Sequence, residues 1–252
     1  MRTDHIYSRV VVEYAEIPQL VLYIMRLDRF LSETTGMSRK EATRTLHRSE
    51  VSVNGDVVKK GAAHVPDEAE VVWNGVRLQL LGPTYLMFHK PVGCICANDD
   101  PNHMTVFSYL DLPNPDKFHT VGRLDLETSG LLLVTNDGQW SHRITSPKHG
   151  CIKVYRAQLA DPVSAADVAA FAKGLQLRGD PKLTEPAELV IVGEKEALVK
   201  VNEGRYHQVR RMFAAVGNKV LELHREQVGE LSLGELEPGE FRALTDAEIA
   251  LF

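Results

Sequence analysis

The stretch GRLDLETSGLLLVTNDG (residues 122–138) decides how this chain folds, because it joins a polar turn directly to an apolar run. The run LLLV at residues 131–134 predicts a buried β-strand, which the turn signal NDG at residues 136–138 ends. Arg123 and Asp125 stand just before that strand. A carboxylate at the edge of a core is costly to bury unless a cation compensates it. Asp125 is therefore either a solvated turn residue or a carboxylate held ionised in a cleft.

The composition is that of a folded protein of a reducing compartment. The 252 residues are 44% hydrophobic and 25% charged, which suits one large domain with a small companion. Cys94, Cys96 and Cys151 form no C-x-x-C pair and no disulfide framework, as is typical of the cytoplasm. No apolar run is long enough to span a bilayer. We expect a cytoplasmic, monomeric protein without membrane contact.

Charge is distributed unevenly along the chain. The formal net charge of −5 argues against a nucleic-acid ligand, but residues 25–66 hold eight Lys and Arg against five Asp and Glu. The tail from residue 226 to 252 holds seven acids and one arginine. The acidity thus belongs mostly to the tail, and the front of the chain is basic.

Residues 1–24 show no pattern that continues into the rest of the chain. The segment EIPQLVLYI (residues 16–24) is apolar, but acids precede it and no small-residue cleavage site follows, which argues against a signal peptide. Organised patterning begins at Met25. We therefore expect Met25 to be the natural start and residues 1–24 to be an extension of doubtful origin.

Residues 25–66 predict two short helices and a hairpin. The apolar spacing in RLDRFL (residues 26–31) indicates the first helix, and an S-x-x-E capping box at Ser38 and Glu41 starts the second. Asn-Gly at residues 54–55 is a strong hairpin signal. The exposed face of these two helices and the hairpin is basic, and a charged face of this kind is most often only solvated surface. The basic residues expected on it are Arg26, Arg39, Lys40, Arg44 and Arg48.

The remaining chain predicts a connector at residues 67–82, with one strand-like piece, and a second domain at residues 83–252. In that domain strands alternate with loops, and a helix capped by Ser164 ends at Gly174. A last helix follows EGRYHQ (residues 203–208). This order indicates an α+β fold with a mixed, mostly antiparallel sheet.

The last helix offers cations to Asp125. His207, Arg210 and Arg211 share a face by three- and four-residue spacing. Arg210 adjoins the apolar stripe, so its guanidinium would be half-buried and would favour a carboxylate partner. Asp125 is the obvious candidate, and the pair would hold an ionised carboxylate fit to act as nucleophile or base. From the residues alone, a solvated turn aspartate remains the favoured interpretation of Asp125.

Two resemblances extend these interpretations. The segments RLDRFL, SRKEA, VSVNG and VVKKGAAHV resemble the S4 RNA-binding domain, although Glu50 stands where a glycine is common. This resemblance implies that the second helix and the turn into the hairpin contact RNA phosphates, with salt-sensitive binding. Residues 25–250 are similar to the RsuA group of pseudouridine synthases. The segments that carry this similarity are GRLDLETSGLLLVTNDG, YLMFHKPVGCICANDDPNHMTVFSYL, GQWSHRITSPKHGCIKVYRAQL and EGRYHQVRRMFAAVGNKVLELHRE.

The second resemblance implies roles for individual residues. Asp125 matches the catalytic aspartate, Tyr155 the aromatic residue that stacks on the target base and assists proton transfer, and Arg210 the basic residue that pairs with the aspartate. Arg123 matches the arginine that helps to hold the extruded nucleotide. Lys90-Pro91 with Gly93 matches a structural motif near the cleft. The residues expected to contact RNA are Arg123, Arg26, Arg39, Lys40, Arg44, Arg48, His207 and Arg211.

The implied reaction converts a uridine of 16S ribosomal RNA, by resemblance uridine 516, to pseudouridine. It breaks the N1–C1′ bond, rotates the base and forms C5–C1′. No redox step occurs and no atoms are lost, so no cofactor is expected. A metal is not expected either, because His142, His149 and Cys151 lack the paired spacing of a zinc site. Asp125 could attack C1′, attack the ring, or remove the C2′ proton to form a glycal.

Several alternatives stay open at this point. The target could be a 23S ribosomal RNA uridine, since related enzymes share these motifs. The chain could instead be a non-catalytic factor that binds ribosomal RNA during assembly. The substrate could be naked RNA or a small-subunit assembly intermediate.

Overall fold

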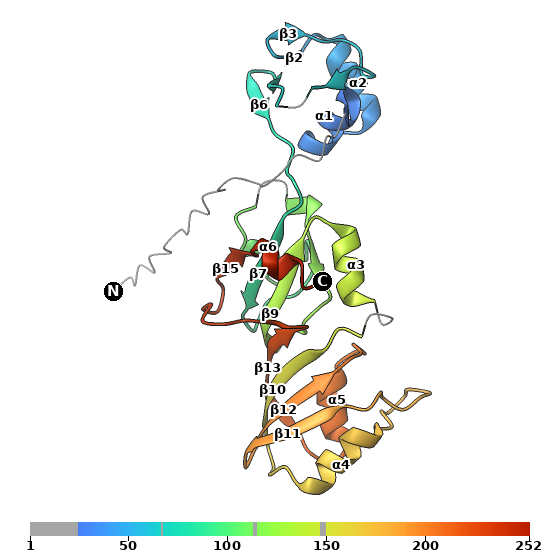
Figure 1. Cartoon of the computed structure of the whole chain (residues 1–252), viewed down its shortest axis with the longest axis vertical. Helices are drawn as coiled ribbons and strands as arrows, with labels where there is room; N and C mark the ends of the chain where they lie inside the picture. Colours follow the sequence, from blue (N-terminus) through green and yellow to red (C-terminus); the bar gives the residue numbers. More distant parts are fainter. Residues whose placement is uncertain (1–24, 67, 113–114, 147–149) are drawn as a thin grey trace, which may run out of the picture. The chain divides into compact units, whose positions relative to one another are not determined.

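The computed structural model describes residues 25–66, 68–112, 115–146 and 150–252 (Figure 1). The expectation that Met25 is the natural start concerns residues 1–24, which lie outside the described part. The chain divides into two compact units between Gly82 and Pro83.

The first unit holds two helices and short strands. Within the described residues, β2, β3, β5 and β6 form one sheet in the order β3-β2-β5-β6, and β1 pairs with β4. The elements are β1 (Met25–Arg26), α1 (Leu27–Thr35), α2 (Arg39–His47), β2 (Val51–Val53), β3 (Asp56–Val57), β4 (His64–Val65), β5 (Val71–Trp73) and β6 (Val76–Leu78).

The expected helices and hairpin of this unit are confirmed. The Ser38 hydroxyl accepts from the backbone N–H of Glu41, and the Glu41 carboxylate accepts from the backbone N–H of Ser38. Asn54 (φ 50°) and Gly55 (φ 88°) form the turn between β2 and β3, where two positive φ angles match the right-handed twist of the strands. Buried Leu31 and Leu46 join the two helices in one core.

The connector expected at residues 67–82 is more structured than the sequence indicates. It contains both β5 and β6, and β5 pairs antiparallel with β2 of the same unit. Trp73 Nε1 donates to Glu50 Oε2 at 3.3 Å, and Val71 is fully buried in the core of this unit. These contacts make β5 and β6 part of the first unit, although each strand has only three residues.

The second unit is built on one long sheet. Its elements are β7 (Tyr85–Lys90), η1 (Val106–Ser108), η2 (Pro115–Lys117), β8 (His119–Val121), β9 (Thr128–Thr135), α3 (Gly138–Thr145), β10 (Lys153–Leu159), α4 (Ala165–Lys173), β11 (Glu188–Gly193), β12 (Glu196–Val201), α5 (Gln208–Ala215), β13 (Val220–Val228), β14 (Leu231–Ser232), β15 (Phe241–Ala243) and α6 (Asp246–Ile249).

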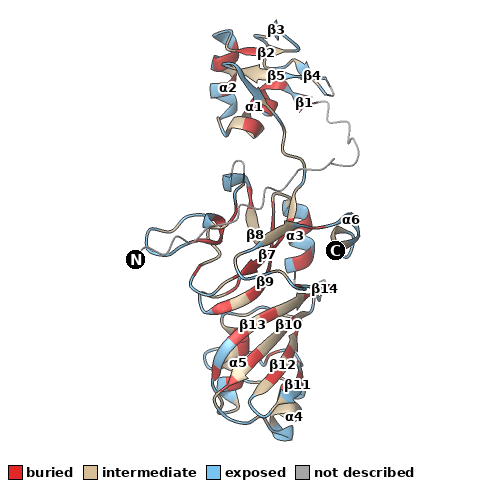
Figure 2. Cartoon of the chain, turned by 90° about the vertical axis from the view of Figure 1, so that its left-hand side faces the viewer, coloured by how far each residue is buried: buried red, intermediate tan, exposed pale blue. Residues whose placement is uncertain are grey.

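The sheet follows the order β11-β12-β10-β13-β9-β7-β15, with β8 added to β9 and β14 to β13. Its described strand pairs are antiparallel except β13 with β9, where Leu223 lies opposite Thr128 and Arg225 opposite Gly130. This confirms the expected α+β fold with a mixed, mostly antiparallel sheet. The apolar run at residues 131–134 is completely buried in β9, as predicted (Figure 2).

Among the described residues of this unit, hydrophobic clusters lie against both halves of the sheet. Helices α4 and α5 cover the half formed by β10, β11 and β12, with Phe171 and Phe213 in its core. Helix α3 lies beside the half formed by β7, β8 and β9, with Trp140 in its core (Figure 1). The parallel pair β9–β13 joins the two halves. The turn that carries Asp125 leads into β9 and therefore lies at this junction.

Gly130 is required at the junction. Its φ of 114° is a conformation that side chains rarely adopt. A Cβ atom at this position would also lie 2.2 Å from the carbonyl oxygen of Arg225 on β13. Only glycine lets β9 and β13 approach so closely at this point.

Candidate active site

The turn at residues 125–128 holds its backbone in place through every one of its carbonyl groups. The N–H of Thr128 closes the turn by donating to the Asp125 carbonyl at 3.0 Å, and the N–H of Gly93 donates to the Leu126 carbonyl at 2.9 Å. Arg210 Nη2 donates to the Glu127 carbonyl at 3.0 Å. Such a fully bonded turn fixes the direction in which the Asp125 side chain leaves the backbone.

Lys90 ties the two ends of this turn together from inside the protein. Its side chain is completely buried, at the end of β7. The ammonium donates to the carbonyls of Asp125 at 3.1 Å, Thr128 at 2.9 Å and Pro91 at 3.0 Å. Three donors thus meet three acceptors, which satisfies the group fully. Burial lowers the pKa of Lys90 below its usual value.

The Asp125 carboxylate itself remains accessible. Its side chain is 36% exposed, and Nε2 of His207 lies 3.5 Å from Oδ1. The carboxylate is therefore held at a surface that a substrate can reach. His207, which the sequence predicts only as an RNA contact, lies beside the candidate catalytic group.

Arg210 is placed differently from the expectation that its guanidinium pairs with the Asp125 carboxylate. Its Nη1 donates to the Val220 carbonyl at 3.2 Å and its Nη2 to the Glu127 carbonyl. It therefore acts on the backbone of the Asp125 turn and on the start of β13. The physical reason is that α5 brings the guanidinium within hydrogen-bond distance of these two backbone carbonyl groups, which take up its Nη donors. Its Nε is buried without a hydrogen-bond partner within the described residues.

Tyr155 lies on the same face of the sheet as α5. It packs against the core that contains Val209 and Met212 of that helix. On β10 it lies opposite Arg225 of β13, which in turn lies opposite Gly130 of β9. Tyr155, Arg225 and Gly130 therefore lie side by side across three strands, and Gly130 follows closely after the Asp125 turn.

The other predicted RNA contacts divide into two groups. Arg123, Arg39, Lys40 and Arg44 are exposed. Three arginines have a carboxylate partner: Arg26 pairs with Asp28 at 2.6 Å, Arg48 with Glu50 at 3.6 Å, and Arg211 with Asp180 at 2.7 Å. The side chains of Arg26 and Arg48 nevertheless remain 50% and 68% exposed.

Arg211 departs most from its predicted role. Besides Asp180, its guanidinium donates to the carbonyls of Arg178 at 2.8 Å and Tyr206 at 3.1 Å. The hydrogen bond from the Arg211 guanidinium, together with that from Arg205, holds the pKa of Asp180 below its usual value. Arg211 therefore fastens the loop before α5 to the loop at residues 178–180.

Sequence reasoning missed several contributors to the site. Nothing in the spacing indicates that Gly93 and Arg210 both bond the Asp125 turn, because those contacts join distant segments. Arg205 and Asp180, which fix the loop before α5, are likewise distant in sequence and close in space. The one available signal is the clustering of polar residues in EGRYHQ just before an apolar helix.

No helix in the described part of the chain is both long and apolar enough to cross a membrane. Within the same residues, no group of three His, Cys, Asp or Glu side chains is arranged to hold a metal ion.

Comparison with known proteins shows to which family the chain belongs. The family model of RNA pseudouridylate synthases matches residues 84–215, which include the Asp125 turn, Tyr155 and Arg210. The chain therefore belongs to the pseudouridine synthase family, enzymes that isomerise uridine within RNA.

Particular relatives resemble nearly the whole chain. "Ribosomal small subunit pseudouridine synthase A" of Vibrio cholerae is 51% identical over 227 residues, covering 90% of this chain and 98% of the relative. The protein of the same name from Escherichia coli K12 is 48% identical over 228 residues, covering 90% and 99%. A solved structure, "Crystal structure of pseudouridylate synthase", is 47% identical, covers 90% of this chain and 100% of its own, and superposes with a TM-score of 0.66.

The contacts of Arg210 predict a selective effect on turnover. We expect Arg210→Ala to lower kcat about 10- to 100-fold, since a small displacement of the Asp125 turn is costly to catalysis. The Kd for RNA should change less than about threefold, because the guanidinium faces backbone carbonyls. Single-turnover kinetics and fluorescence anisotropy measure the two quantities. Lys219→Ala, which removes an exposed cation, is the control, and an unchanged kcat in Arg210→Ala would contradict the assigned role.

Proposed function

We propose that this chain isomerises one uridine of 16S ribosomal RNA, at the position that corresponds to uridine 516, to pseudouridine. The observation that carries the target is its identity of about half to relatives named for the ribosomal small subunit, over nearly their full length. The observation that carries the chemistry is the accessible Asp125 carboxylate on a turn with every carbonyl bonded.

The roles of the side chains follow from their positions. The uridine leaves its stack, which costs a few kcal/mol and is offset by stacking on an aromatic ring such as Tyr155. Asp125 then acts on C1′, on the uracil ring or on the C2′ proton, and each route needs an ionised carboxylate at fixed geometry. Arg210 and Lys90 supply that geometry through the backbone.

The proposal also covers the oligomeric state of the protein, its compartment and the form of its substrate. Asp125, Tyr155, His207 and Arg210 all come from one chain, so one copy is enough to form the site. The described cysteines are free, as suits a reducing cytoplasm. The substrate in the cell is the ribosomal RNA, alone or within a small-subunit assembly intermediate.

Pseudouridine mapping tests the target. Chemical labelling and primer extension are applied to 16S and 23S RNA from cells with and without the gene. We expect one 16S uridine to lose its mark in the absence of the gene. A change confined to 23S RNA would show that the target uridine lies in that RNA. No change in either RNA would favour a non-catalytic assembly factor.

The first unit is proposed to bind RNA phosphates through α2. Ser38 caps this helix, and Arg39, Lys40 and Arg44 stand exposed on it. Phosphate contacts of this kind release counterions, so binding weakens with salt.

Replacing these three cations by glutamine tests the role of the first unit. We expect the slope of log K against log salt to become shallower by about two to three in the triple variant R39Q/K40Q/R44Q, since each lost phosphate contact removes roughly 0.7–0.9. Helix stability changes little, because glutamine is also a good helix former. The matched control replaces exposed Lys173, Lys195 and Lys219 of the second unit. Equal slopes for the triple variant and the wild type would show that α2 does not contact RNA phosphates.

A further inference from the structure

Tyr206, in the loop before α5, has an aromatic ring to which the proposed reaction assigns no role. The side chain of Tyr206 is 76% exposed. Its ring stacks on that of His207, with ring centroids 3.9 Å apart and planes 17° apart. One face of Tyr206 therefore lies on the imidazole, and the other is open to solvent. A ring this exposed contributes little apolar burial to the fold, and its open face is available to a ligand.

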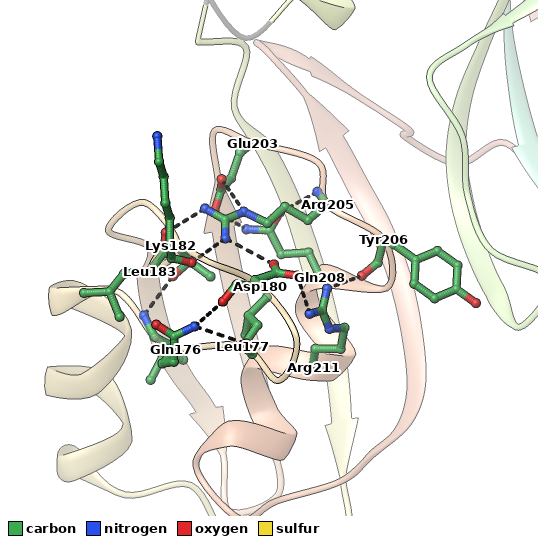
Figure 3. Close-up of polar contacts among 12 residues, drawn as sticks. Gln176, Leu177, Asp180, Lys182, Leu183, Glu203, Arg205, Tyr206, Gln208 and Arg211 are labelled. Atoms are coloured by element: carbon green, nitrogen blue, oxygen red, sulfur yellow. Dashed lines mark hydrogen bonds and ion pairs between the residues drawn. The ribbon is translucent and has the colours of Figure 1, made fainter.

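The backbone that carries Tyr206 is fixed in place. Arg205 donates to Asp180 at 3.2 Å, and Arg211 bonds both Asp180 and the carbonyl of Tyr206 (Figure 3). The Gln208 side chain accepts from the N–H of Arg205 at 2.8 Å. Figure 3 shows the Tyr206 ring pointing away from this network. The ring is thus presented at a set position, which lowers the entropy lost when a ligand stacks on it.

The stack begins at the reacting group. His207 has a left-handed backbone, with φ at 49°, at the N-terminal cap of α5. This conformation is uncommon outside glycine and sets the direction of the imidazole. The imidazole Nε2 lies 3.5 Å from Asp125 Oδ1. Going outward from the carboxylate, the order is therefore Asp125, His207, Tyr206.

We propose that the open face of Tyr206 stacks a nucleobase next to the target uridine in the RNA strand, making Tyr206–His207 a base platform beside Asp125. The proposal rests on the proposed function, since it needs an RNA strand whose uridine is presented to Asp125. Extruding a uridine deprives its neighbour of a stacking partner, and an aromatic ring replaces that partner without reading the sequence. The platform thus holds the strand on one side of the extruded nucleotide.

The test compares Tyr206→Ala and Tyr206→Phe with the wild type, all as the full chain. The RNA is a 16S fragment with 2-aminopurine placed, in separate samples, on the 5′ or 3′ side of the target uridine. We expect the alanine variant to raise Kd and KM about 5- to 150-fold, the range that stacking of one base represents, with kcat within about threefold. The phenylalanine variant should stay within twofold. Protein-induced fluorescence change at one flanking position should persist with phenylalanine and vanish with alanine.

Controls separate this role from a structural one. The ring is mostly exposed, so the thermal midpoint of Tyr206→Ala should equal that of the wild type. Ile191→Ala, at an exposed position on β11, should leave both Kd and fluorescence unchanged. Unchanged Kd and fluorescence in Tyr206→Ala, or a loss confined to kcat, would overturn the platform.

Failure of the proposed function would look different. In that case the wild type leaves the 16S uridine unconverted. The affinities of the wild type and Tyr206→Ala are then compared on the same fragment by fluorescence anisotropy. Equal affinities would overturn the platform, and a loss in the alanine variant alone would support it independently of the reaction.

Discussion

Asp125→Asn should abolish pseudouridine formation while leaving the protein folded and able to bind RNA. We expect turnover to fall by about 10³-fold or more, because the amide can act neither as a base nor as a nucleophile. Folding should not change, since the turn is held by its carbonyl groups rather than by the carboxylate. Release of tritium from RNA labelled at C5 of uridine measures the reaction, because C5 loses its hydrogen as it bonds to C1′.

Glu127→Gln is the matched control for this variant. Glu127 is an exposed acid two residues away on the same turn, and its backbone carbonyl rather than its side chain accepts from Arg210. The change removes the same charge and should leave turnover within about twofold. Activity within tenfold of wild type in Asp125→Asn would contradict the assignment of Asp125. Comparable losses in both variants would show that only the local charge matters.

Lys90→Met should both destabilise the second unit and slow catalysis. The substitution keeps the buried volume but removes the ammonium that bonds three carbonyl groups. Leaving buried carbonyls without donors should lower the free energy of unfolding by about 2–4 kcal/mol. For a unit of this size the thermal midpoint should drop by roughly 5–15 °C. The kcat should fall by more than the smaller fraction of folded protein accounts for, because the Asp125 turn is no longer anchored at both ends.

Lys153→Met provides the comparison. Lys153 on β10 is also partly buried, and burial lowers its pKa as well, but within the described residues it makes no side-chain hydrogen bond. Removing it should leave the thermal midpoint unchanged or raise it slightly, since a desolvated charge disappears. Thermal unfolding followed by circular dichroism and single-turnover assays measure both variants. Equal midpoints for Lys90→Met and the wild type would contradict the anchoring role of Lys90.

The local elements of this fold are largely encoded in local sequence. The capping box at Ser38, the Asn54-Gly55 turn and the buried run that begins at Leu131 each act within a few residues, so the sequence predicts them correctly. The strands β5 and β6 are different. Each has only three residues, so the sequence predicts a connector with one strand-like piece there. The pairing of β5 with β2, and of β6 with β5, places both strands in the sheet of the first unit.

The candidate site shows the same division. Asp125 stands out because a carboxylate precedes a core strand, and its family resemblance gives it a role. The partners of its turn do not stand out. Arg210 bonds a carbonyl across the fold instead of the expected carboxylate, and His207 takes the place beside Asp125. Helix spacing shows which face a residue shares, but the packing of α5 against the sheet decides which atoms it meets.

Complementation of a deletion strain tests whether Asp125 of this chain converts a uridine of 16S RNA. The strain receives the wild-type gene, the Asp125→Asn gene or no gene, at matched protein levels, and pseudouridine is mapped in 16S and 23S RNA. We expect one 16S pseudouridine to return with the wild-type gene alone. A mark restored by Asp125→Asn, or a 16S pattern that is the same in all three strains, would contradict it.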